Sequence, residues 1–483
     1  MTNTTKLLAL VGLASLAPLA SCNDPLHVNI PDIVQPGQLT DSAALATVRA
    51  GVLGDFGIAY TGDHPDGSGA TGASEGVIMY GGLLADEWIN SETFPTRIEV
   101  DARTIQETNA DVDLWFRRMH QARTSAEKAA AQYARFAFPH SDPNGAEMLT
   151  LAGMTYVFFA ETWCSGVPIS HLNADGTIAY GTPLTTRELL DTAIARFDAA
   201  ITATSDADMT AFATVEKARA VLDTSGFAAA GALANAVPTS FVYLEEHSEN
   251  TDRENNGVFN ANFPDQRYAV ANAEGGNGFR FRSAWDRRTP FIAPTDPSSG
   301  DTLPGFDGET ILWTQQRYGS RKTSITVATG VEARLIQAEA ALRTGDTLAG
   351  GQFLAQLNQP RVSPTERSYF DPSPVAPGDT TTQPIGALPA LTVTDITNAG
   401  GAVNLLFAER ARWLWLTAHR LGDLRRLVRP VAQGGYGRPA NSVFPTGPYF
   451  KVNFANYGTD VNFPVPVTEK NNPNFTGCLD RNP

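Results

Sequence analysis

Several long segments of the chain place apolar residues at steps of three and four, which is the period of one face of an α-helix. The pattern occupies residues 42–60, 147–163, 187–202, 212–237 and 331–346. The fourth of these breaks at "TSG", a turn signal that divides it into two helices. Frequent alanines allow close helix contacts, and paired helices joined by a short turn are typical of tetratricopeptide-like repeats. The sequence therefore predicts a mostly α fold, a tetratricopeptide-like scaffold of helical hairpins.

Long irregular stretches separate these helices. They lie at about residues 60–76, 247–321 and 360–390. The middle stretch is rich in asparagine, glycine and aromatic residues. Loops of this length inside a folded domain are more often functional than passive. We therefore expect the long loops to carry the binding site.

The amino terminus has the composition of an export signal. Lys6 precedes the apolar run "LLALVGLASLAPLA", which is too short to span a bilayer as a helix. The run is followed by "SC" in the junction "LASC", which resembles the bacterial lipobox, so residues 1–22 are interpreted as a lipoprotein signal peptide with Cys22 as the acylated residue. Residues 23–40 are proline-rich without helical period, which predicts an extended tether before a single helical domain at 41–483. No later apolar run approaches about 18 residues, so we expect no transmembrane helix.

The formal net charge of −15 argues against nucleic acid as a partner, because phosphate binding requires a basic surface. One late segment, "ERARWLWLTAHRLGDLRRLVR", carries six arginines against two acids. Two interpretations are open: a surface for an anionic ligand, or arginines that brace an acidic helical body. Apolar residues at steps of three and four anchor the segment in a core, which favours bracing. We expect a helix that ends at Gly422, with Asp423 capping the next turn and Glu409 paired with Arg412.

Beyond Cys22 the chain has two cysteines, Cys164 and Cys478. In an exported protein they can form a disulfide, and two unrelated buried thiols are the alternative. Their spacing fits no zinc pattern, and the seven histidines form no metal-binding motif. The sequence thus indicates no metal and no other cofactor. No catalytic constellation is visible, so we expect a protein without enzymatic activity.

Two tryptophans in polar surroundings are candidates for ligand stacking. Trp88 lies near Asn90 in "LLADEWINSETF", and Trp285 is followed by Asp286 and Arg287 in "FRSAWDRRTPF". Flat rings bury ligand area at small entropic cost, and flanking polar groups can orient hydroxyls or amides. These five residues are therefore interpreted as candidates for binding oligosaccharide or peptide. The alternative is that both tryptophans are core residues at the ends of loops.

Four segments resemble characteristic motifs of the SusD/RagB-type outer-membrane nutrient-binding lipoproteins. They are "EMLTLAGMTYVFFAETWCSGVPIS", "GVEARLIQAEAALRTGD", "LLFAERARWLWLTAHRLGDLRRL" and "FPVPVTEKNNPN". Together with the lipobox they span nearly the whole chain in the family's order. The third segment departs from the family pattern at residues 416–419, "LTAH", and residues 247–321 have no residue-by-residue match. The resemblance therefore transfers no ligand-binding residue.

The resemblance implies a SusD-like fold and a lipid-anchored protein on the cell surface, at the outer membrane. It implies capture of oligosaccharide or peptide and delivery to a SusC-like TonB-dependent transporter. The alternatives are an exported hydrolase on a helical scaffold and a tetratricopeptide-type scaffold that binds only proteins. A catalytic constellation would favour the hydrolase, and long loops without a small-ligand pocket would favour the protein-binding scaffold.

Overall fold

The computed structural model describes residues 41–63, 74–137, 141–173, 175–363, 372–374, 382–451 and 454–482. The chain divides into two compact units, Met1–Ala44 and Leu45–Pro483. Of the first unit only residues 41–44 are described, including the 3₁₀ helix η3 (Ser42–Ala44). The signal peptide with Cys22 and the tether at 23–40 lie outside the described residues, as do residues 64–73 of the predicted loop at 60–76 and residues 364–371 and 375–381 of the loop at 360–390.

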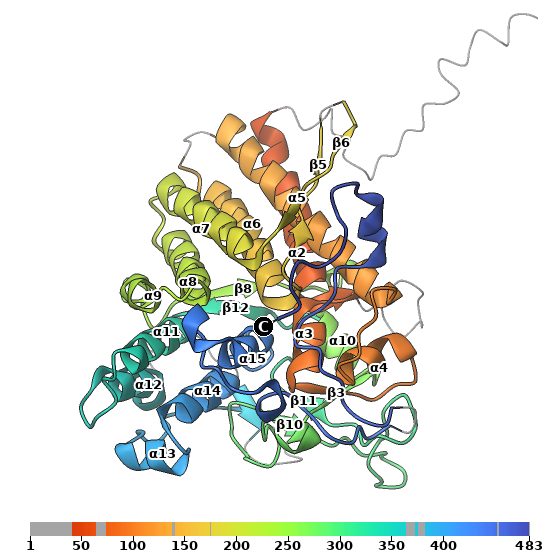
Figure 1. Ribbon diagram of the computed structural model, residues 1–483, viewed down its shortest axis with the longest axis vertical. Helices are drawn as coiled ribbons and strands as arrows, with labels where there is room; N and C mark the ends of the chain where they lie inside the picture. Colours follow the sequence, from red (N-terminus) through yellow and green to blue (C-terminus); the bar gives the residue numbers. More distant parts are fainter. Residues whose placement is uncertain are drawn as a thin grey trace, which may run out of the picture. The chain divides into compact units, whose positions relative to one another are not determined.

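The second unit is built from α-helices that pack on one another in chain order (Figure 1). Neighbouring pairs include α2 on α5, α5 on α6, α6 on α7, α7 on α8, α8 on α9, and α11 on both α9 and α12. The bounds of these helices are α2 (Leu45–Thr61), α5 (Ala110–Phe136), α6 (Pro143–Thr162), α7 (Thr186–Ala203), α8 (Ala207–Asp223), α9 (Phe227–Ala234), α11 (Gly330–Arg343) and α12 (Gln352–Val362). The prediction of a mostly α scaffold of tetratricopeptide-like hairpins is confirmed.

Local sequence explains where these helices begin and how closely they pack. Thr185 and Glu188 form a reciprocal capping box at the start of α7, which satisfies two otherwise orphaned backbone N–H groups. Where α6 meets α7, a Cβ on Gly153 would lie 2.5 Å from the ring of Phe197, so only glycine allows this approach. A small residue is therefore the point of close contact between α6 and α7.

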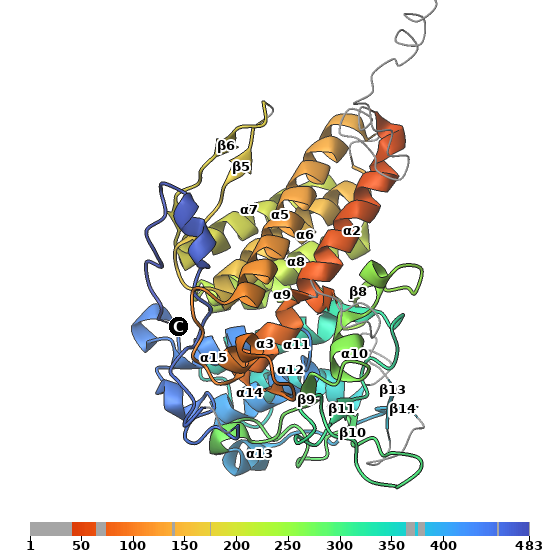
Figure 2. The same ribbon diagram turned by 90° about the vertical axis from the view of Figure 1, so that its right-hand side faces the viewer.

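Short elements interrupt the helical series at several places. Between α2 and α5 lie α3 (Val77–Ala85), β3 (Trp88–Asn90) and α4 (Pro95–Asp101). Between α9 and α11 lie β8 (Val242–Glu245), η4 (Asp252–Glu254), α10 (Gly257–Asn262), β9 (Tyr268–Val270), η5 (Glu274–Gly276), β10 (Phe291–Ile292), β11 (Thr314–Gln315) and β12 (Ile325–Thr329). Antiparallel pairs β3–β9, β10–β11 and β8–β12 tie these insertions together, and Figure 2 shows β9 to β11 at the end of the unit away from α5 and α6.

The remaining elements are the helices α14 and α15 and a number of shorter segments. They are β1 (Gly62–Asp63), β2 (Ser74–Glu75), β4 (Val167–Pro168), β5 (His171–Leu172), β6 (Ile178–Ala179), β7 (Pro183–Leu184), β13 (Pro372–Pro374), β14 (Thr382–Pro384), α13 (Val393–Asn398), α14 (Ala402–Trp413), α15 (Arg420–Val428), η6 (Val431–Gln433), η7 (Ala440–Ser442) and η8 (Val467–Asn471). Antiparallel pairing joins β1 to β2, β4 to β7, β5 to β6 and β13 to β14.

The arginine-rich segment forms two helices, α14 and α15, so the expectation of a helix ending at Gly422 is wrong. The chain leaves the helical path between them, where Leu416 and Ala418 adopt positive φ angles of 56° and 62°. Glu87 accepts a hydrogen bond from the backbone N–H of Leu416 at 2.9 Å and holds this break. Gly422 instead lies inside α15, where a Cβ would press on Glu161 at 2.9 Å.

The arginines of this segment brace the acidic helical body, as the sequence favoured. Arg410 pairs with Asp423, and Arg420 donates to both carboxylate oxygens of Asp86 at 2.6 and 2.7 Å. Arg426 contacts three carboxylates, those of Asp223, Glu339 and Asp423. The expected pair of Glu409 and Arg412 is present at 3.5 Å. The buried charges of this segment are therefore largely neutralised inside the protein.

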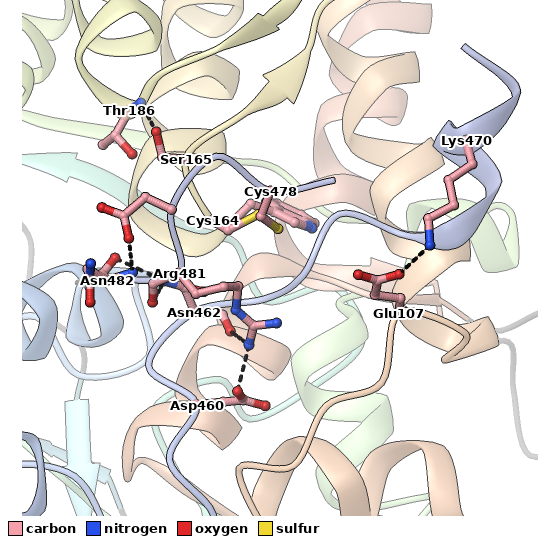
Figure 3. Close-up of a disulfide and its surroundings, with 12 residues drawn as sticks. Glu107, Cys164, Ser165, Thr186, Asp460, Asn462, Lys470, Cys478, Arg481 and Asn482 are labelled. Carbon is pink, nitrogen blue, oxygen red and sulfur yellow. Dashed lines mark hydrogen bonds and ion pairs between the residues drawn. A yellow bond between two sulfur atoms is a disulfide. The ribbon is translucent and has the colours of Figure 1, made fainter. Parts of the chain in front are cut away.

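Cys164 and Cys478 form a disulfide, which fastens the last residues of the chain to the end of α6 (Figure 3). Backbone hydrogen bonds run beside it, from Cys164 N–H to the carbonyl of Phe463 and from Ser165 N–H to that of Asp480. Of the two alternatives for the cysteines, a disulfide or two separate thiols, the structure therefore has the disulfide.

One helix, Ser42–Thr61, is long and apolar enough to cross a membrane by length and composition, contrary to the expectation of none. A core helix of a soluble protein passes the same test. Val52, Phe56 and Tyr60 of this helix are buried in the main apolar core, and Arg49 forms an ion pair with Glu147. The packing of α2 accounts for the apolar residues at Leu45, Val52 and 56–60, which are buried.

Candidate functional site

Trp285 is the most exposed tryptophan among the described residues. Its side chain is 59% exposed, and its backbone has a φ of 50°, a left-handed conformation that costs energy for a bulky residue. A turn with a hydrogen bond from Trp285 N–H to the carbonyl of Arg282 holds the residue in place. Exposure and strain together make Trp285 a candidate for ligand contact.

Two further rings lie beneath and beside Trp285: Phe291 is buried, at 6% exposure, and Trp313 is partly buried. The ring of Trp285 lies 5.1 Å from that of Phe291 in β10, and Phe291 lies 5.7 Å from Trp313, immediately before β11. The guanidinium carbon of Arg282 sits 4.3 Å from the ring centre of Trp313. We call Trp285, Phe291 and Trp313 the aromatic face. The β10–β11 pair fixes its spacing, because Phe291 and Trp313 enter neighbouring strands.

A cavity lies beside the turn at residues 304–311, which precedes β11 and is closed by a bridge between Pro304 and Ile311. We call it the second cavity. This cavity of about 530 Å³ is lined by Glu92, Thr93, Ile98, Asp307, Glu309, Thr310, Phe450, Lys451 and Phe454. Lys451 crosses it and donates to Asp307 at 2.9 Å and to the side-chain oxygen of Asn90 at 2.8 Å. Nearby, the exposed rings of Phe94 and Phe306 stack with centres 6.0 Å apart. This hollow therefore offers both apolar and polar contacts.

Another cavity has a volume of about 640 Å³ and is lined by arginines from several elements, and we call it the arginine cavity. Its lining includes Asp286, Arg288, Arg361, Asp395, Glu409, Arg412, Arg420 and Arg438. Burial raises the pKa of the Glu409 carboxyl, but Arg288 and Arg361 outweigh burial and lower it to about 2. Burial likewise opposes ionisation of Asp286, yet its bonds to Arg288 lower its pKa to about 2. Both acids are therefore charged inside the cavity.

The structure separates the predicted site residues into two groups. Trp88 is only 1% exposed and its ring packs edge-on against Tyr268, and Asn90 is fully buried. The polar neighbours of Trp88 serve the fold, because Asp86 binds Arg420 and Glu87 holds Leu416. Trp88 is therefore a core tryptophan at the end of a loop, which is the alternative given in the sequence analysis.

Trp285 keeps its place at the surface, but the polar residues after it are engaged elsewhere. Asp286 forms ion pairs with Arg288 at 2.7 Å and Arg412 at 3.1 Å. Arg287 donates to the backbone carbonyl of Ile385 at 3.0 Å. Trp285 and Asp286 thus face different sites, the aromatic face and the arginine cavity.

Sequence reasoning missed Trp313, Arg282 and the second cavity. Trp313 follows "ETIL" within the long 247–321 stretch, without the run of polar neighbours that marked Trp285. Its partnership with Phe291 depends on the pairing of β10 with β11, which two-residue strands do not reveal in sequence. Among the described residues, no group of three or more His, Cys, Asp or Glu side chains is arranged to hold a metal ion.

A scan against protein-family models and a search of curated proteins each find no match for the chain. Solved structures do match it. A SusD/RagB family protein from Bacteroides thetaiotaomicron VPI-5482 is 12% identical, with 88% of this chain and 94% of that chain covered and a TM-score of 0.60. Surface glycan-binding protein A from Bacteroides uniformis is 13% identical, with 90% of this chain and 99% of that chain covered and a TM-score of 0.58. A laminarin-binding SusD-like protein is 12% identical, with 91% of this chain and 99% of that chain covered and a TM-score of 0.54. The chain has a SusD-like fold, as the sequence resemblance implied.

Proposed function

We propose that this protein is a non-enzymatic, cell-surface lipoprotein that binds glycans at the aromatic face. The observation that carries the proposal is the exposed ring of Trp285, held at a positive φ beside Phe291 and Trp313. Strained, exposed aromatic residues are costly to keep and are concentrated at functional sites. The apolar face of a sugar ring matches a flat aromatic surface.

Carbohydrate is preferred to peptide because two of the similar structures are named for binding glycan or laminarin. The long loops around the aromatic face and the second cavity provide hollows of the size that small ligands occupy. These hollows also favour a small-ligand binder over a scaffold that binds only proteins.

The SusD-like fold and the lipobox also support a place in nutrient uptake. We infer that Cys22 anchors the protein to the outer membrane and that it passes its ligand to a SusC-like TonB-dependent transporter. The fold likeness supports binding without turnover, in preference to an exported hydrolase. Incubation of the purified protein with a bound glycan is expected to release no smaller products; products that persist through repurification would favour the hydrolase.

The binding proposal is tested by calorimetry with soluble glycans, starting with laminarin and a panel of other neutral polysaccharides. Trp285→Ala is expected to weaken binding by about 1–4 kcal/mol, the scale of aromatic anchors at interfaces. Its melting temperature is expected to stay near that of the wild type, because the ring is mostly exposed.

Tyr180→Ala is the matched control. Tyr180 is also an exposed aromatic residue, but it follows β6 on a hairpin remote in sequence from the aromatic face. Its replacement is expected to leave glycan binding unchanged. Equal affinity of folded Trp285→Ala and wild-type protein for every bound glycan would remove Trp285 from the site.

A further inference from the structure

The arginine cavity contains more cationic than anionic groups, although the chain as a whole is acidic. Five arginines and three acids line it. The arginines come from separate parts of the chain: Arg288 in the 247–321 stretch, Arg361 in α12, Arg412 in α14, Arg420 in α15, and Arg438 in the segment after α15. Folding brings these charges together in one hollow.

Most of the anionic charge in the cavity is already engaged. Glu409 receives Arg288 at 2.7 Å and Arg361 at 2.8 Å. Asp286 receives Arg288 through two hydrogen bonds of 2.7 and 2.8 Å. Asp395 accepts hydrogen bonds from the backbone N–H and the hydroxyl of Thr392 at the start of α13. Arg420 takes Asp86, which lies outside the lining.

Arg412 shares both of its acids with Arg288. Its Nε lies 3.1 Å from Asp286, without hydrogen-bond geometry, and its Nη1 reaches Glu409 at 3.5 Å. Burial and then the charge of Arg288 lower the pKa of Arg412, so its cationic form is poorly compensated where it stands. The guanidinium stays 5.1 Å from the ring of Phe279, with a side chain 22% exposed.

Arg438 is the other cation of the lining that stands out, because its recorded partner is an amide. Its guanidinium donates to the side-chain oxygen of Asn404 at 2.6 Å, and among the described residues it forms no ion pair. The lining of the cavity also includes the apolar residues Leu405, Phe407, Leu424 and Val443. The cavity therefore combines apolar lining residues with Arg412, whose two acids are shared with Arg288, and Arg438, which has no acidic partner among the described residues.

We propose that the arginine cavity is a binding site for a carboxylate carried by a small ligand, with Arg412 as the main contact and Arg438 as the second. A guanidinium matches a carboxylate through two parallel N–H···O bonds. The three acids in the lining disfavour a phosphate dianion, whereas a single negative charge compensates the excess cation. A volume of about 640 Å³ accommodates a uronic acid disaccharide or a short peptide with its carboxyl terminus.

Two pairs of probes separate the sources of the carboxylate. A disaccharide with one uronic acid residue is compared with its uncharged methyl ester, and N-acetyl-trialanine with its carboxyl-terminal amide, by calorimetry at low ionic strength because salt screens the contact. Wild-type protein is expected to bind at least one of the two acids. Its affinity for the matched neutral compound is expected to be lower by a factor of about ten or more. Equal binding of acid and neutral partner in both pairs would overturn the proposal, as would tight binding of inorganic phosphate alone.

Arg412→Gln identifies the site. The variant is expected to lose about tenfold or more in affinity for the acid and little for the neutral partner. It is expected to melt at or above the wild-type temperature, because Arg288 and Arg361 still neutralise Asp286 and Glu409 while one repelled cation is gone. Arg412→Lys keeps the charge without the fork and is expected to bind with intermediate affinity.

Two controls keep the result independent of the aromatic face. Arg187→Gln removes an arginine on the exposed face of α7 and is expected to bind the acid as the wild type does. Trp285→Ala is expected to retain the preference for the acid. Acid binding that survives in folded Arg412→Gln, or that disappears equally in Arg187→Gln, would assign the carboxylate elsewhere and overturn the proposal.

Discussion

Arg410 donates from Nε to both carboxylate oxygens of Asp423, at 2.9 and 2.8 Å, across the break between α14 and α15. Both side chains are almost completely buried. The second cation on Asp423 is Arg426, at 2.8 Å, which also holds Glu339. One carboxylate therefore joins the two helices and connects them to α11.

Asp423→Asn is expected to lower the free energy of unfolding by about 3–5 kcal/mol, because it removes one partner of a buried ion pair and leaves the charge of Arg410 uncompensated. Burial raises the pKa of Asp423, but Arg410 and Arg426 outweigh it and hold the pKa well below its usual range. The contribution of Asp423 is thus present above its unfolded pKa of about 4 and is lost as the pH falls toward the folded value. Urea denaturation at neutral and acidic pH measures both effects.

Asp191→Asn is the control for this prediction. Asp191 also pairs with an arginine, Arg187, but the two side chains are 51% and 65% exposed. Its replacement is expected to change stability by about 0.5 kcal/mol or less. Similar losses in the two variants would mean that burial does not set the strength of the Arg410–Asp423 pair.

Glu87 has the opposite titration. Burial raises the pKa of Glu87 to about 8, against the effect of its hydrogen bond from Leu416 N–H. Between the ordinary value of 4.5 and about 8 the folded protein holds a proton that the unfolded chain releases. The free energy of unfolding therefore falls as the pH rises through this window, by at most about 1.4 kcal/mol per pH unit from this group.

Glu87→Gln isolates this contribution, since a glutamine oxygen can still accept from Leu416 N–H. The stability of the variant relative to wild type is expected to increase steadily from pH 5 to pH 8, over the range that the raised pKa of about 8 defines. Denaturation curves of both proteins at matched pH values measure the difference. A difference that stays constant with pH would show that Glu87 is already ionised at pH 5.

The helical hairpins could be predicted from sequence because helices such as α7 and α8 carry their own apolar stripes and side-chain caps. The break at Leu416 could not, because the segment "WLWLTAHRLG" has no proline and its glycine lies inside α15. The positive φ at Leu416 and Ala418 is maintained by partners far along the chain, such as Glu87. Tertiary contacts overrode local helical preference there.

Tertiary contacts also limit what the sequence reveals about the candidate site. Trp88 and Trp285 have similar polar neighbours in sequence, but only folding shows that Asp86 and Glu87 turn toward α15 while Trp285 remains at the surface. The arginine-rich segment likewise serves both interpretations. Arg410 and Arg426 brace the body, whereas Arg412 lies in a cavity whose acids are shared with arginines distant in sequence.

Removal of the disulfide is expected to lower the free energy of unfolding by about 2–5 kcal/mol, because a covalent link between residues 314 positions apart restricts the unfolded chain. The measurement compares wild type with Cys164→Ser/Cys478→Ser in urea, both without reductant. Addition of reductant to the denaturation series is expected to lower the stability of the wild type and leave that of the double variant unchanged. Wild-type protein whose unreduced peptides contain two free thiols would contradict the pairing.

Cys22→Ala is expected to abolish the membrane association that we propose, since acyl chains on Cys22 would supply the anchor. Cell fractionation should move the variant from the outer-membrane fraction to a soluble fraction, while the wild type stays with the membrane. Ser21→Ala changes the neighbouring residue without touching the thiol and serves as the control. A variant that remains in the outer membrane at wild-type yield would require another means of attachment.

Trp88→Ala is expected to destabilise the protein by about 3–5 kcal/mol, the usual cost of removing a buried aromatic side chain. The ring packs against Tyr268 and so closely over α3 that a Cβ on Gly82 would lie 2.8 Å from it. Thermal melts of Trp88→Ala and Trp285→Ala make the comparison direct, because a large loss is expected only in the first. Calorimetry below the melting transition should find glycan affinity of the wild-type order in Trp88→Ala and reduced affinity in Trp285→Ala. A folded Trp88→Ala variant that keeps wild-type stability but loses its glycan would restore Trp88 to the binding site.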